Sequence, residues 1–150
     1  MWSFEPPRCL RSPRERLDGY VILPRLIDKV RAYARGELPK EYHRNLLRPG
    51  VTLDGRFLRF TGLDADALRA AILSTTSDEE VVRWIAQQGV VHSDEEKRQW
   101  AIQVESYRPE GRVLAFLQAA SPALAAKVDL SRFSLFDVID MDEGRLAIPV

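Results

Sequence analysis

The sequence predicts an irregular, compact all-α domain of six to eight helices. Helix-capping patterns recur along the chain, and apolar residues repeat with a helical period in its first third. With 150 residues, 45% of them hydrophobic and 29% charged, the chain has the size and composition of one globular domain. We therefore expect a single helical domain over residues 11–150, preceded by an extended segment over residues 1–10.

The first third of the chain contains two expected helices. Ser12-Pro13-Arg14-Glu15 has the pattern of a capping box, which predicts a short helix that stops by Gly19. A second helix is expected to begin near Leu23-Pro24 and to run to Arg35, where Gly36 would end it in the left-handed conformation. The apolar stripe of this second helix is formed by Leu23, Leu26, Ile27, Val30 and Ala34.

The next segment is rich in turn residues. Residues 37–52 are interrupted by prolines, so they are predicted to be loop with at most a turn or two of helix. Residues 56–61 fit neither the helical nor the strand period cleanly, and we favour a short helix that Gly62 ends. Asp64 is then expected to cap a helix over residues 65–73.

Two further capping boxes, beginning at Ser77 and Ser93, each predict a helix with three acidic residues in its first turn. The first helix is expected to end at Gly89 and the second before Pro109. Because only a short connection separates them, they are predicted to form an antiparallel helical hairpin with Trp84 and Trp100 turned toward the core.

The last third is more apolar. Residues 112–120 are apolar almost all round, which predicts a helix buried on most sides. Ser121-Pro122 is expected to start a new helix, because a proline inside a helix costs about 3 kcal/mol. The tail offers four apolar side chains that could dock on the core: Phe133, Leu135, Phe136 and Ile139.

Charge is unevenly distributed although the net charge is zero. Residues 8–48 contain eleven basic and five acidic residues, so the rest of the chain is acidic. One interpretation is that the two parts face each other, within the fold or across a homodimer. The other is that the basic part binds a small anionic ligand.

The densest polar set lies in and around the helix expected after Leu23. The face opposite its apolar stripe could simply be solvated, or it could form a basic cleft for a small anion or an acidic partner segment. In the second case Arg25 and Lys29 would donate to the anion, and Asp28 would orient Arg25. Candidate ligand-binding residues are Tyr20, Arg25, Asp28, Lys29, Tyr42 and His43.

The sequence leaves the function unknown and favours a binding or interaction domain. Phosphate-binding, dinucleotide-binding, hydrolase and zinc-protease motifs are absent, so no cofactor is expected. An alternative is a small enzyme that uses the same cleft on a carboxylate- or phosphate-bearing substrate, with His43 or Tyr42 moving a proton. Nucleic-acid binding is a second and less favoured alternative, because the isoelectric point is about 6.7. Cys9, His43 and His92 make a poor zinc set, so no metal is expected.

The expected location is the cytoplasm. The first ten residues lack the apolar core of a signal peptide, and the longest apolar run, residues 113–128, is interrupted by polar residues and a proline. A membrane partner is therefore not expected.

One long motif is specific enough to suggest a family. Residues 11–32, RSPRERLDGYVILPRLIDKVRA, together with EYH at 41–43 and LD at 53–54, resemble a family of small bacterial proteins known only as a domain of unknown function. The resemblance implies a stand-alone bacterial domain of about this length. It implies no activity, substrate or catalytic residue.

Overall fold

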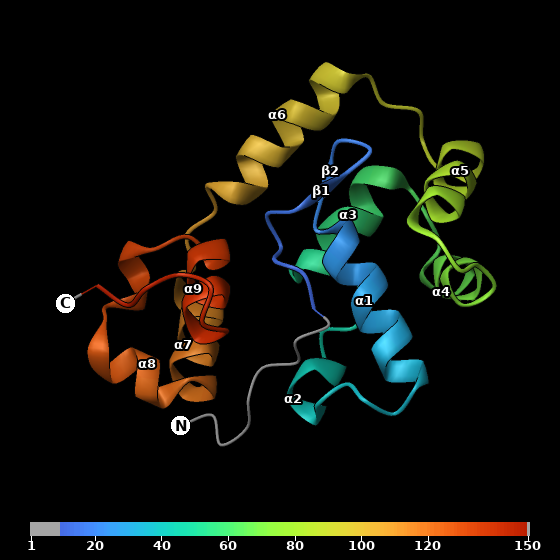
Figure 1. Ribbon diagram of the computed structural model, residues 1–150. Helices are drawn as coiled ribbons and strands as arrows, with labels where there is room; N and C mark the ends of the chain where they lie inside the picture. Colours follow the sequence, from blue (N-terminus) through green and yellow to red (C-terminus); the bar gives the residue numbers. More distant parts are fainter. Residues whose placement is uncertain (1–9, 150) are drawn as a thin grey trace. The chain divides into compact units, whose positions relative to one another are not determined.

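The computed structural model describes residues 10–149, and within them nearly all regular structure is helical (Figure 1). The predicted all-α class is confirmed, with nine α-helices and one 3-10 helix in the described span; several of the helices are only one or two turns long. The elements are β1 (Arg16–Leu17), β2 (Tyr20–Val21), α1 (Leu23–Ala34), α2 (Lys40–His43), α3 (Leu53–Thr61), α4 (Ala65–Leu73), α5 (Asp78–Gln88), α6 (Asp94–Glu105), α7 (Gly111–Ala120), α8 (Pro122–Lys127), η1 (Leu130–Arg132) and α9 (Leu135–Asp142).

The described residues divide into two compact units, residues 10–98 and residues 99–149. Helix α6 begins in the first unit and ends in the second. The expectation of one domain over residues 11–150 stays a prediction. The extended segment expected over residues 1–10 lies, apart from Leu10, outside the described residues.

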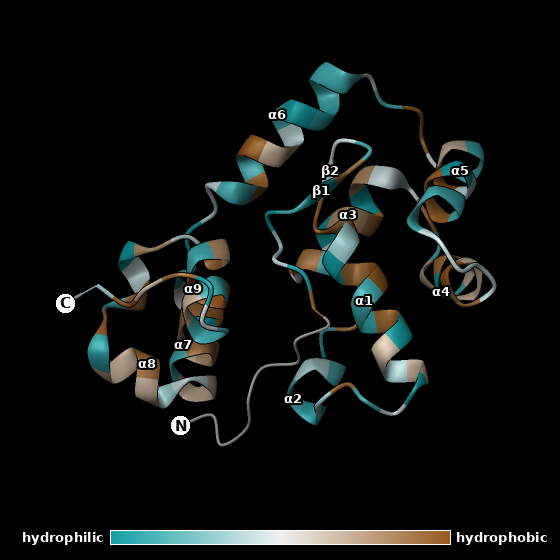
Figure 2. Ribbon diagram, viewed as in Figure 1, coloured by the Kyte–Doolittle hydropathy of each residue, from teal (hydrophilic) through white to brown (hydrophobic). Residues whose placement is uncertain are grey.

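Helix α1 forms where the apolar period predicts it. Figure 2 shows apolar and polar residues alternating along this helix, and Leu23, Leu26, Ile27 and Val30 are at most 1% exposed. Gly36 follows in the left-handed conformation with φ 72°, as expected. Helix α1 packs against α4, which in turn packs against α5.

The helix expected to begin at Ser12 and stop by Gly19 does not form. The capping contacts of the Ser12 box are present: the Ser12 N–H donates to Glu15 Oε2 over 3.1 Å, and Ser12 Oγ accepts from the Arg14 N–H over 3.2 Å. Asp18 and Gly19 both have positive φ, 51° and 82°, which is the signature of a type I′ hairpin turn. This turn pairs β1 with β2 antiparallel and overrides the helix signal.

The predictions for the middle of the chain are confirmed. Residues 37–52 contain one short helix, α2. Residues 56–61, which fit neither period cleanly, form part of a regular helix, α3, and Gly62 ends this helix with φ 69°. Asp64 caps α4 by accepting from the Ala67 N–H over 2.9 Å.

The capping boxes of α5 and α6 form, but the expected hairpin of these two helices does not. Ser77 accepts from the Glu80 N–H and Ser93 from the Glu96 N–H. The helix that packs against α5 is α4. The connection between α5 and α6 has no regular structure over residues 90–93. Its Val90 N–H donates to the Thr61 carbonyl at the end of α3 over 2.8 Å, which holds this connection against α3. Trp100 is 9% exposed and Trp84 is only half-buried.

Helix α7 is far more exposed than its composition suggests, and none of its side chains is buried. Only one face of α7 packs: Leu114 and Leu117 contact a core cluster whose buried members are Leu124, Leu130, Val138 and Met141. The exposed apolar residues of α7 are three alanines, whose small side chains would bury little area, and Phe116, which is 39% exposed. The expectation of burial on most sides was therefore wrong. In the tail, Leu135 and Phe136 are buried, whereas Phe133 and Ile139 are half-buried.

We predict that Gly55→Ala destabilises the protein by about 1–3 kcal/mol, although alanine is the better helix former by about 1 kcal/mol. A Cβ at Gly55 would lie 2.5 Å from the carbonyl oxygen of Gly50 and 2.8 Å from that of Arg48. Urea denaturation measures the free energy of unfolding. Gly36→Ala is the control, because a Cβ there would meet no atom within 4 Å and only the positive φ opposes the change. A Gly55→Ala variant as stable as the wild type would contradict the close approach.

Candidate functional site

Three of the six candidate residues are buried, and the other three are half-buried or exposed. Tyr20, Arg25 and Lys29 are only 4%, 5% and 6% exposed. Asp28 and Tyr42 are half-buried, and His43 is exposed. The solvated helix face considered as the alternative is therefore wrong for Arg25 and Lys29, because both cations lie inside the first unit.

Lys29 forms a buried ion pair with Asp54 of α3. Its Nζ lies 2.9 Å from both carboxylate oxygens of Asp54, and the two side chains are 7% and 0% exposed. The Leu47 N–H also donates to Asp54 Oδ2 over 2.9 Å. The Lys29 ammonium neutralises the Asp54 carboxylate, and three hydrogen bonds in all offset the cost of burying it.

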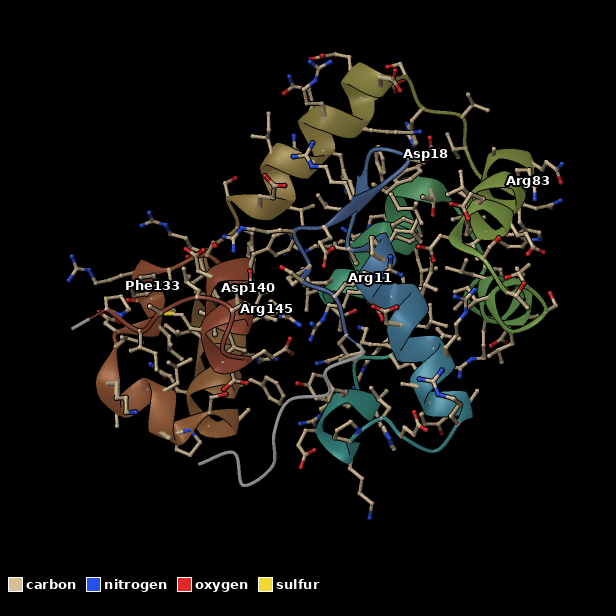
Figure 3. All side chains as sticks on the ribbon, viewed as in Figure 1. Arg11, Asp18, Arg83, Phe133, Asp140 and Arg145 are labelled. Atoms are coloured by element: carbon tan, nitrogen blue, oxygen red, sulfur yellow. The ribbon has the colours of Figure 1, made fainter. Side chains whose placement is uncertain are left out.

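Asp28 is held by Arg11 and does not act as an orienting partner for Arg25. Arg11, labelled beside α1 in Figure 3, bonds Asp28 through Nε at 3.0 Å and Nη2 at 3.1 Å, and its backbone N–H donates to the same carboxylate over 2.8 Å. The Arg11 guanidinium also bonds Asp78 at the start of α5, over 2.8 Å and 3.3 Å. The hydrogen bond to Asp78 raises the pKa of Arg11 and lowers the pKa of Asp78 below its ordinary value. Arg31 lies farther from the Asp78 carboxylate, at 3.9 Å.

Tyr20 belongs to an aromatic cluster rather than to a cleft. Its ring packs edge-on against Phe57 and Phe60 of α3, and Lys97 Nζ lies 4.6 Å from its centroid. Burial, with a smaller contribution from the Asp18 charge, raises the pKa of Tyr20. Lys97 also donates to the carbonyl and carboxylate oxygens of Asp18, which ties the start of α6 to the hairpin turn.

Of the remaining candidates, the structure brings Arg25 and Tyr42 together. The Arg25 guanidinium lies 5.7 Å from the Tyr42 ring centroid and donates to the Arg11 carbonyl over 3.2 Å. The ring of His43 packs edge-on against Tyr33, and its Nε2 lies 2.7 Å from the Leu38 carbonyl oxygen. The six residues are therefore distributed over several contacts and do not line one cleft.

Sequence reasoning missed the partners that neutralise this set, namely Arg11, Asp54 and Asp78. The capping box that begins at Ser77 accounts for Asp78 only as an acidic residue in the first turn of α5. Arg11 and Asp54 lie in two of the three stretches that carry the family resemblance, so that motif contained a signal for them. The local periodicity of the sequence contains no signal for these partners. The Lys29–Asp54 and Arg11–Asp78 pairs join residues 25 and 67 positions apart in the chain.

Four exposed cations follow one another along α2, the next loop and α3. We call this set the basic surface; it comprises Lys40, Arg44, Arg48 and Arg59. Glu41 is the exposed acid among them, and the other acid of the segment, Asp54, is neutralised inside. Among residues 10–149, no group of three or more His, Cys, Asp or Glu side chains is placed to hold a metal ion. In the same span, no helix is long and apolar enough to cross a membrane.

We predict that Asp78→Asn removes a pH-dependent part of the stability, worth about 1 kcal/mol because the ion pair is partly exposed. The folded-state pKa of Asp78 is lowered from 3.8, so its contribution is present above pH 3.8 and is lost as the pH falls through the folded-state pKa. The stability difference between wild type and variant should therefore shrink in acid. Glu79→Gln, on the same turn, is the control for a lost charge. A difference that stays constant into strong acid would contradict the prediction.

We predict that Lys29→Met destabilises the protein by about 3–5 kcal/mol, because it leaves the Asp54 carboxylate buried without its counter-charge. The double variant Lys29→Met with Asp54→Asn should recover at least half of this loss, since the amide is neutral and can still accept from Leu47. Chemical denaturation of both variants measures the effect. Equal destabilisation by the single and the double variant would show that the charge pair is not the cause.

Comparison with known proteins places the chain in a family. Over residues 7–145 it matches the family described as Domain of unknown function (DUF5069). No curated protein matches the chain. The match spans most of the chain, both units included, and it confirms the resemblance to a family without a known function. The chain therefore belongs to the DUF5069 family.

Proposed function

We propose that this protein is a non-enzymatic binding protein of the bacterial cytoplasm that recognises an acidic segment of a partner protein. The observation that carries the proposal is the difference in solvent exposure among the basic residues of the first unit. Lys29 is buried and Arg11 half-buried in the first unit, whereas the four cations of the basic surface are exposed to solvent. Exposed arginines with planar guanidinium groups suit carboxylates on a partner.

An acidic segment fits this surface better than a small anion does. The residues expected to line a cleft for a small anion, Arg25 and Lys29, are buried. The cations of the basic surface are instead distributed over α2, the next loop and α3, so a partner that contacts several of them must be larger than a small anion. The net charge of zero also favours an acidic polypeptide over nucleic acid, because binding to a phosphate backbone usually requires a positive domain.

The surroundings of His43 support a binding role over catalysis. Its Nε2 bonds the Leu38 carbonyl and its ring packs on Tyr33, so its contacts fix α2 against the end of α1. A general base must instead reach a proton on the substrate. Lys29 and Tyr20, which could also move protons, are buried in structural contacts.

We predict that a fluorescent oligoglutamate peptide binds the protein at low ionic strength and is released by salt, because exposed charges are screened. Arg44→Ala with Arg48→Ala should weaken this binding at least about tenfold, as measured by fluorescence anisotropy, if each lost contact contributes about 1 kcal/mol. The matched control is Lys127→Ala with Arg132→Ala, which removes two exposed cations from the second unit.

Two results would contradict the proposal. One is equal weakening by the control pair, which would indicate a general charge effect. The other is tighter binding of single-stranded oligothymidylate than of oligoglutamate, which would favour nucleic acid as the partner.

A further inference from the structure

We propose that residues 47–52 form a preorganised binding loop that presents Arg48 and Arg59 to a partner carboxylate, and that the buried Asp54 side chain, neutralised by Lys29, positions this loop by accepting from the Leu47 N–H. This inference rests on the proposed function and identifies the part of the basic surface that confers specificity. Lys29 and Asp54 act through the backbone of the loop and are positioning residues.

The first contact that fixes the loop is at Leu47. Its φ is 51°, a left-handed conformation that is unfavourable for a residue with a branched side chain. The residue is nevertheless only 4% exposed, and its N–H donates to Asp54 Oδ2 over 2.9 Å. The Asp54 carboxylate is in turn held by Lys29 Nζ through both oxygens. The hydrogen bond to the buried Asp54 oxygen therefore compensates for backbone strain at the start of the loop.

The rest of the loop is fixed against the first turn of α3. The Thr52 hydroxyl donates to the Arg48 carbonyl over 2.5 Å and accepts from the Gly55 N–H over 2.9 Å. Gly55 lets the backbone of the loop pass where a Cβ would collide with Gly50. At the tip, Arg59 Nη2 donates to the Gly50 carbonyl over 3.2 Å. Strained backbone that is held by several independent contacts is typical of binding loops.

The consequence is a fixed backbone at Arg48 and a fixed guanidinium group at Arg59. The Arg48 side chain is exposed on the loop, and its backbone is held by Thr52. Arg59 uses one N–H on the Gly50 carbonyl and has further donors for a ligand. A loop that is already ordered loses little conformational entropy when a partner binds, so its arginines bind more tightly than the same residues on a mobile loop.

Two double variants separate the hydrogen bond that holds the Leu47 N–H from the Lys29–Asp54 ion pair. Lys29→Met with Asp54→Asn removes both charges and keeps an oxygen that can accept from the Leu47 N–H. Lys29→Met with Asp54→Leu removes both charges and that acceptor as well. Each variant is examined by amide hydrogen exchange at Leu47 and by anisotropy with the oligoglutamate peptide.

With Asn at position 54 we expect near wild-type exchange and binding. With Leu at position 54, the Leu47 amide should exchange about ten- to hundredfold faster, because its N–H loses its buried acceptor, and the peptide should bind at least about tenfold more weakly. Arg48→Ala in the wild-type background should weaken binding while leaving Leu47 exchange unchanged.

The inference is overturned if the Leu variant keeps both slow exchange at Leu47 and wild-type affinity, or if it exchanges faster but binds equally well. A wild-type protein that shows slow exchange at Leu47 but does not bind the peptide would instead refute the proposed function. If the Leu variant fails to fold, Thr52→Val tests the preorganisation of the loop at its other contact, because it removes the hydroxyl that holds the Arg48 carbonyl. Wild-type affinity for the peptide in that variant would overturn the inference.

Discussion

The first unit depends on one buried interaction, the ion pair between Lys29 and Asp54. Lys29 lies on the long helix α1 and Asp54 in the first turn of α3, so the pair joins two helices separated by a long irregular segment. A carboxylate with 0% exposure is tolerable only because a cation and a backbone N–H both bind it. The apolar side chains around it supply most of the burial energy, while the pair fixes how α3 and its preceding loop meet α1.

The same principle extends to the rest of this unit and explains its uneven charge. Arg11 joins Asp28 on α1 to Asp78 on α5, and Lys97 joins the hairpin turn at Asp18 to α6. In two of these pairs, Lys29–Asp54 and Arg11–Asp78, a cation from the basic N-terminal part meets an acid from the later part. Two of the eleven basic residues in the segment 8–48 are thus paired with acids from later in the chain, which neutralises part of the asymmetry along the sequence.

Local signals predicted the elements whose cause is local. The period of α1, the Asp64 cap and the left-handed glycines after α1 and α3 depend on residues a few positions apart, and all were predictable. The β-hairpin was missed although Asp18-Gly19, a dipeptide typical of two-residue hairpin turns, is in the sequence. The burial of α7 was overestimated because the composition of a helix does not show which of its faces pack against other elements. The partners of Lys29 and Arg11 lie too far along the chain for any local pattern to reveal.

These pairs also decide where a ligand can bind. An anion that used Lys29 would have to displace a carboxylate that is covalently part of the chain and is already held by three hydrogen bonds. It would also leave Asp54 buried beside it, and an uncompensated buried charge costs several kcal/mol. Binding at the predicted cleft is therefore opposed by the interaction that stabilises the fold. Recognition of an anionic group is left to exposed cations, and two of these, Arg48 and Arg59, lie on the loop and the helix that the same pair holds in place.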